Sequence, residues 1–179
     1  MARPSIPQRL RVFLGCEGES ERSYAALLQQ LIPNVHLNTK VLGGGDPLAL
    51  IEKAIRLIAS DVPRRAPYAV MGLLLDEDRL GQDADRDRRA IEKATASSLH
   101  LIWQRPCHEA ILLRHLPGCE HLRPQTSELA LLQLLRYWPQ YSKGTSAVEL
   151  SHHIGEQELR QVLPVEPELG TFLRALGLR

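Results

Sequence analysis

The sequence predicts an α/β fold with a mainly parallel sheet of about four strands, flanked by helices and followed by a C-terminal helical extension. Short apolar runs alternate with amphipathic helical segments through most of the chain, a pattern typical of parallel α/β sheets. The run at 68–75 is almost wholly apolar, as expected for a strand buried on both faces. With 179 residues, 44% of them hydrophobic, the chain can form its own core.

Four strands are expected in regular order. The first covers 10–15, and the second covers 35–42, where mixed polarity suits the edge of a sheet. The third is the apolar run at 68–75, and the fourth covers 99–103. The expected helices cover 20–32, 47–59, 88–97, 107–116, 127–137, 146–154 and 166–176.

The chain is expected to form an α/β core over 1–123 and a helical extension over 124–179. The pattern becomes purely helical after Pro124, and no glycine- or serine-rich linker separates the two parts. We therefore expect the extension to pack on the core.

Cysteine usage and the apolar pattern favour a cytoplasmic protein with no membrane association. The three cysteines are an odd number, and the start MARPSIPQRL lacks the apolar stretch of an export signal. No apolar run approaches the roughly 18 residues of a membrane span. The net charge of +1 argues neither for nor against binding to a polyanion such as nucleic acid.

Acidic residues follow three of the four expected strands. Glu17 comes after the first, Asp76-Glu77-Asp78 after the third, and Glu109 lies in the first turn of the helix after the fourth. The carboxyl ends of parallel strands meet at one edge of a sheet, so these side chains should lie close together. Carboxylates without sulfur or imidazole partners suit Mg²⁺ or Mn²⁺.

The spacing of these acids predicts which of them bind the metal. Alternation along an extended segment places Asp76 and Asp78 on one side and Glu77 on the other. We therefore expect Asp76 and Asp78 to be metal ligands, and Glu77 to be solvated or salt-bridged. Glu19 and Glu21 are explained by the preference of helix starts for negative charge.

Four short segments resemble a known family. Segment 16–21, CEGESE, resembles the first Toprim motif of overcoming-lysogenization-defect nucleases, and segment 76–78, DED, resembles the Toprim DxD motif. With 105–115, RPCHEAILLRH, and 141–144, YSKG, the order resembles that of the RloB-like family, a Toprim-related group. The resemblance covers residues 11–144.

This resemblance implies a Toprim-like sheet, a site for Mg²⁺ (or Mn²⁺), and phosphodiester chemistry on nucleic acid. The matching residues are Glu17, Asp76, Asp78 and Glu109 as metal ligands and catalytic residues, and Lys143 as a catalytic positive charge. The family frequently has an ATPase partner encoded nearby in phage-defence settings. We expect a metal-dependent nuclease, a hydrolase, and the sequence does not distinguish DNA from RNA.

Two other function classes were compared with this one. A non-catalytic Toprim-like subunit that binds an ATPase partner or nucleic acid remains an alternative, because the chain has no ATPase domain of its own. A receiver-like or dehalogenase-like phosphotransfer domain fits less well. The dehalogenase motif has its aspartates on the first strand with a threonine following, whereas Asp78 follows a later strand and precedes Arg79. A receiver has a serine or threonine after the fourth strand, where this chain has Gln104 and Arg105.

A charged segment after the third strand has two readings. Arg79, Arg86, Arg88 and Arg89 lie beside the expected metal site and could hold a phosphate backbone. Aspartates at 83, 85 and 87 interleave with them, which favours a solvated loop.

Overall fold

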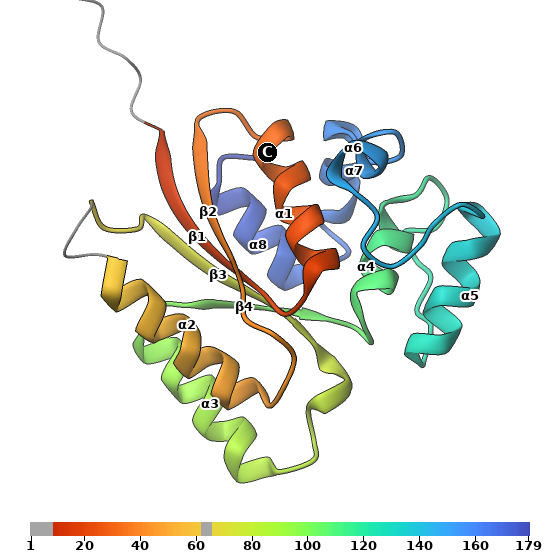
Figure 1. The fold of residues 1–179 in the computed structure, drawn as a ribbon. Helices are drawn as coiled ribbons and strands as arrows, with labels where there is room; N and C mark the ends of the chain where they lie inside the picture. The colour runs from red at the N-terminus through yellow and green to blue at the C-terminus, as the bar shows by residue number, and fades with distance from the viewer. Residues whose placement is uncertain (1–8, 62–65) are drawn as a thin grey trace, which may run out of the picture.

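The computed structural model describes residues 9–61 and 66–179 and shows an α/β fold built on a four-stranded, all-parallel sheet (Figure 1). The strands are β1 (Leu10–Cys16), β2 (Val35–Val41), β3 (Val70–Asp76) and β4 (His100–Gln104), in the order β2-β1-β3-β4. The apolar strand β3 is thus interior, and β2 is at an edge. The predicted fold class is confirmed, and the sheet is consistent with a Toprim-like arrangement.

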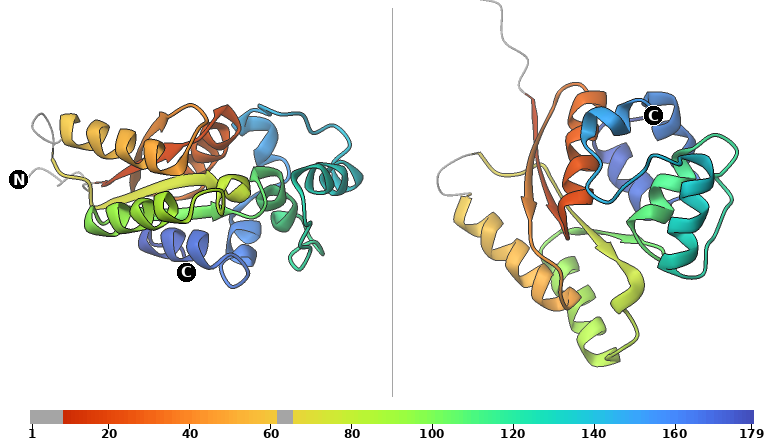
Figure 2. Two further views of the ribbon diagram at one scale, coloured as in Figure 1. Left: turned by 90° about the horizontal axis from the view of Figure 1, so that it is seen from below. Right: turned by 45° about the vertical axis from the view of Figure 1, so that its right-hand side comes forward.

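Helices cover both faces of this sheet. Those in the described ranges are α1 (Glu19–Leu31), α2 (Pro47–Asp61), α3 (Ala84–Ala96), α4 (His108–His115), α5 (Ser127–Tyr137), α6 (Ala147–Ser151), α7 (Glu156–Val162) and α8 (Pro167–Ala175). Figures 1 and 2 show α2 and α3 on one face, and α1 and α8 on the other. Within residues 9–61 and 66–179, none of the helices has the length and apolar character needed to cross a bilayer.

Alternate side chains of the strands enter two separate cores. Phe13 and Leu75 belong to a cluster with residues of α2 and α3. Leu14 and Leu74 belong to a larger cluster with residues of α1, α4 and the C-terminal helices. Because both faces are buried, the interior strand β3 is a near-continuous apolar run, whereas the edge strand β2 has mixed polarity.

A close contact between β3 and α8 fixes the C-terminal helices on the sheet. A Cβ atom at Gly72 would lie 2.5 Å from Cε2 of Phe172, whose side chain is fully buried. Only glycine leaves room for the ring to pack directly on the strand backbone. Residues on both sides of position 123 therefore share one core.

The side chain of Gln29 covers part of the outer edge of β2. Its Nε2 donates to the carbonyl oxygen of Val35 at 3.0 Å, and the N–H of Leu37 donates to its Oε1 at 2.7 Å. These are backbone groups that a further strand would otherwise pair with.

Helix α3 begins earlier than predicted. It starts at Ala84 instead of Arg88, because Asp83 acts as the N-cap and its side chain accepts a hydrogen bond from the N–H of Arg86 at 3.1 Å. Asp85 and Asp87 lie in the first turn, where the helix dipole favours negative charge. Part of the charged segment is therefore helical.

The helix predicted over 146–154 is also wrong in its extent. Helix α6 ends at Ser151, and α7, which was not predicted, begins after Gly155. Glu158 starts the second helix by accepting a hydrogen bond from the N–H of Gly155 at 2.9 Å. This cap was overlooked because both helices are short.

A buried ion pair joins α4 to the start of α8. The side chains of Arg114 and Glu166 are only 1% and 6% exposed, and the Nε of Arg114 contacts Oε1 of Glu166. Arg114 also donates to the carbonyl oxygen of Arg105 at 3.0 Å. One guanidinium thus connects α4, the segment after β4 and the N-cap of α8.

Replacing Arg114 by Met should lower the free energy of unfolding by about 3–5 kcal/mol, because the Glu166 carboxylate would stay buried without its cation. Urea denaturation at pH 7 measures this difference. The matched control is Arg160→Met, which breaks the surface pair with Glu156, whose partners are 48% and 55% exposed. It should change stability by less than about 1 kcal/mol. Equal losses in both variants would contradict the role of the buried pair.

Candidate functional site

Acidic side chains gather at the carboxyl edge of the sheet. Glu17 directly follows β1, and Asp76 is the last residue of β3. Glu21 and Glu109 lie in the first turns of α1 and α4. These groups and Asp78 all act electrostatically on Asp76, so the residues expected as metal ligands do meet at one place.

Glu17 connects the ends of the two central strands. Its Oε2 accepts a hydrogen bond from the backbone N–H of Asp76 at 3.1 Å. A Cβ atom at Gly44 would lie 3.7 Å from its Oε1. The glycine-containing loop after β2, residues 43–45, therefore borders the site.

The carboxyl group of Asp76 is strongly perturbed. Burial raises its pKa to about 8, and the negative charges of Glu21, Glu17, Asp78 and Glu109 act in the same direction. At neutral pH, and without a cation, this group therefore holds a proton. The site is short of positive charge.

The segment after β3 is not extended, which corrects the alternation predicted for it. Residues Glu77–Arg79 form a single 3₁₀ turn. Asp78 is exposed at this turn, beside Asp76. Glu77 forms an ion pair with Arg105 at 2.9 Å, which confirms it as a salt-bridged neighbour.

Glu109 has a different environment from Asp76. The hydroxyl of Tyr141 donates to its Oε1 at 3.3 Å, and Nζ of Lys143 lies 3.7 Å from the same oxygen. Burial acts to raise the pKa of Glu109, but a hydrogen bond from Cys107, its own backbone N–H and the charge of Lys143 bring it below the ordinary value. Glu109 is therefore ionised at neutral pH.

Lys143 reaches the site from the loop between α5 and α6. The N–H of Gly144 donates to Oγ of Ser20 at 3.2 Å, which ties this loop to the first turn of α1. The side chain of Lys143 is 75% exposed, so its ammonium group remains accessible. The C-terminal part of the chain thus supplies a cation to the carboxyl edge.

Gln104, the last residue of β4, was missed by sequence reasoning. It is fully buried, and one end of its amide lies 3.0 Å from Oδ1 of Asp76 and 3.3 Å from Oε1 of Glu21. The other end lies 2.6 Å from Nδ1 of His108. The available signal was a polar residue closing an otherwise apolar strand at the edge where ligands bind.

Two arginines of the charged segment after β3 form surface ion pairs, while the side chain of Arg79 lies outside the described residues. Arg86 pairs with Asp46, and Arg88 pairs with Asp85 at 3.2 Å. These surface pairs favour the solvated reading over a phosphate-binding loop.

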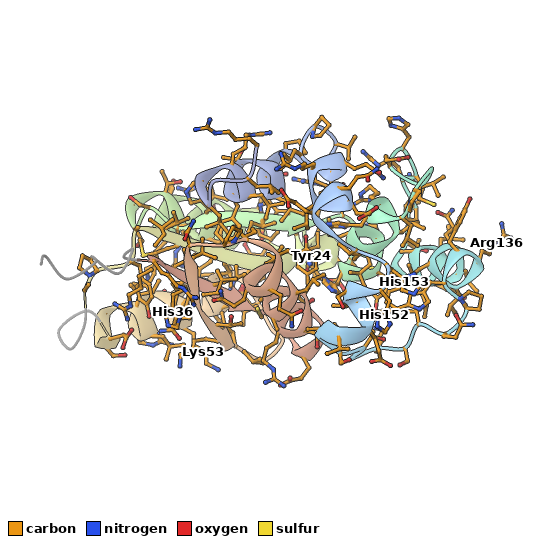
Figure 3. The ribbon with its side chains drawn as sticks, turned by 90° about the horizontal axis from the view of Figure 1, so that it is seen from above. Tyr24, His36, Lys53, Arg136, His152 and His153 are labelled. Atoms are coloured by element: carbon orange, nitrogen blue, oxygen red, sulfur yellow. The ribbon has the colours of Figure 1, made fainter. Side chains whose placement is uncertain are left out.

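Other basic side chains are spread over the molecule. Figure 3 shows Arg136, His152 and His153 at the end formed by the C-terminal helices, while His36 and Lys53 lie at the other end. At the carboxyl edge, Arg105 is paired with Glu77 and Glu168, and Lys143 is the cation beside Glu109.

The chemistry of the site fits a hard divalent cation. Its donors are carboxylate oxygens, and their charges are incompletely balanced by Lys143. Among the residues that the structure describes, no three His, Cys, Asp or Glu side chains form a ready-made metal cage. Mg²⁺ usually keeps several waters and takes only one or two protein carboxylates together with substrate phosphates, so such a cage is not required.

Comparisons of this chain with protein-family models, with curated proteins and with solved structures give no match. The fold and the site define an α/β protein with a carboxylate cluster at the carboxyl edge of a parallel sheet.

The perturbed Asp76 gives stability a definite pH dependence. Its pKa is about 8 in the folded protein against an ordinary value of 3.8, so as pH rises between these values the unfolded state ionises first. The folded protein therefore loses stability over this range and reaches a plateau above it.

Asp76→Asn should remove this loss. In metal-free buffer above pH 8 the variant should be more stable than wild type by on the order of 3 kcal/mol, and the difference should vanish below about pH 4. Urea denaturation with EDTA from pH 4 to pH 9 tests this. Asp85→Asn, at a side chain that is 85% exposed, is the control and should show no pH-dependent gain. A gain in the stability of Asp76→Asn that was the same at every pH would contradict the raised pKa of Asp76.

Proposed function

We propose that this protein is a Mg²⁺-dependent, nuclease-like hydrolase that cleaves phosphodiester bonds in nucleic acid, with Mn²⁺ as a substitute metal. The observation that carries the proposal is the crowding of Asp76 by other carboxyl groups at the carboxyl edge of the sheet. A titratable group perturbed in this way is unfavourable for folding and typical of functional sites. The ordered resemblance to the Toprim-related RloB-like family supports the same chemistry.

Each residue has a distinct part in this proposal. Glu17, Asp76 and Asp78 hold the ion, and Glu109 lies at the edge of the same cluster. A Mg²⁺ ion bound there supplies water activation and stabilises charge on phosphoryl oxygens. Lys143, exposed and 3.7 Å from Glu109, provides a positive charge for the phosphate or the leaving oxygen. The hydrogen bond from Gly144 to Ser20 holds its loop in place.

A non-catalytic or partner-dependent subunit is the second candidate. Helix α5 exposes Leu129, Leu132 and Tyr137 to 43%, 52% and 55%. An apolar face of this kind suits docking to a partner protein, and the resemblance suggests an ATPase in a phage-defence setting. The three free, buried cysteines support the expected cytoplasmic location.

Mg²⁺ binding tests the metal site directly. Isothermal calorimetry on wild type should show binding that is lost in Asp76→Ala and retained in Asp85→Ala. Because Asp76 holds a proton below about pH 8, binding at pH 7 should release it. The Mg²⁺ affinity should therefore increase by at most about tenfold per pH unit as the pH rises toward the pKa of Asp76. Absence of binding by folded wild type, also with nucleic acid present, would remove the catalytic proposal and leave the subunit.

Cleavage assays test the chemistry. Lys143→Met should lower the turnover of an oligonucleotide substrate by about 10²-fold, since a charge at the transition state is lost. Its Mg²⁺ affinity should remain close to that of wild type. Single- and double-stranded DNA and RNA serve as substrates, with and without an ATPase encoded nearby. Lys93→Met, which breaks a surface pair with Glu52, is the control. Equal turnover in both variants would contradict the role of Lys143.

A further inference from the structure

We infer that Gln104 is a positioning residue that decides which carboxyl oxygens at this site can face a cation. This inference rests on the proposed function. Gln104 is fully buried at the end of β4, and its amide touches Glu21 from α1, Asp76 from β3 and His108 from α4. One side chain thus links three of the elements that meet at the carboxyl edge.

The neighbours of Gln104 fix the direction of its amide. Oε1 of Glu21 accepts a hydrogen bond, and Oδ1 of Asp76 accepts one in either protonation state when the proton lies on Oδ2, so the amide nitrogen faces these oxygens at 3.3 Å and 3.0 Å. The amide oxygen then accepts a hydrogen bond from Nδ1 of His108 at 2.6 Å. The reverse orientation would set the amide oxygen against the two carboxyl groups.

His108 is built to hold this orientation. Its side chain is 2% exposed, and its ring meets that of Tyr24 edge-on with centroids 5.8 Å apart. Nε2 is buried and has no hydrogen-bond partner among the described residues, so the ring hydrogen belongs on Nδ1. The imidazole therefore donates a hydrogen bond from Nδ1 to the amide oxygen of Gln104.

This arrangement separates the two acids that Gln104 touches. Both oxygens of Glu21 face a donor within the fold: Oε2 accepts the N–H of Gly18 at 3.0 Å, and Oε1 faces the amide of Gln104 at 3.3 Å. Asp76 uses Oδ1 for Gln104 and keeps Oδ2 for a ligand. Gln104 thus competes with a cation for Oε1 of Glu21 and holds the carboxyl group of Asp76 in one orientation, as groups that hydrogen-bond to metal ligands do.

Mg²⁺ calorimetry on the full chain tests this role. Gln104→Met keeps the side-chain length but removes the amide, and should weaken Mg²⁺ binding by about 10- to 100-fold. The matched control is Gln161→Met in α7, which also removes a partly buried amide and should leave the affinity unchanged. Circular dichroism establishes that each variant is folded.

The variants of His108 test the positioning role independently, even if the Gln104→Met variant does not fold. His108→Asn keeps a donor near the place of Nδ1 and should retain wild-type affinity. His108→Leu removes the donor and should weaken binding by about tenfold. Wild-type affinity in the folded Gln104→Met and His108→Leu variants would overturn the positioning role while leaving the proposed function intact. Failure of wild type to bind Mg²⁺ would overturn both.

Discussion

The burial of Asp76 among other carboxyl groups is the constraint on which the organisation of this site depends. Burial alone makes ionisation of Asp76 unfavourable, and the neighbouring acids add to the effect. Glu109, equally part of the cluster, stays ionised because Cys107 and Lys143 stabilise its charge. The two carboxyl groups therefore have opposite protonation states at neutral pH. Such divergence between adjacent groups is characteristic of sites that handle protons or cations. This difference in protonation connects the fold to the proposed chemistry.

The C-terminal helices are part of this arrangement. Phe172 packs against the backbone of β3 at Gly72, and Glu166 pairs with the buried Arg114 of α4. With α5 to α8 held in this way, the loop that carries Tyr141 and Lys143 reaches the carboxyl edge. The part of the chain predicted as an extension thus contributes Lys143, the cation beside Glu109. A sheet without these helices would gather the acids and leave them unbalanced.

Much of the fold could be predicted from the sequence, because apolar runs and helix caps are local signals. The alternation of strands and helices identified the parallel sheet, and acids at strand ends indicated where Glu17 and Asp76 meet. The contacts of Gln104 could not be predicted, since two of its partners, Glu21 and Asp76, are distant from it in sequence. The 3₁₀ turn after Asp76 was also missed, because pattern alone does not show where an extended strand stops.

The amide of Gln29 at the edge of β2 has a consequence for how this protein meets others. By occupying the carbonyl of Val35 and the N–H of Leu37, it imitates a neighbouring strand and closes that stretch of the sheet to growth. Exposed strand edges can pair side by side with strands of other chains and lead to aggregation. Along this stretch of β2, that pairing is blocked from within the same polypeptide.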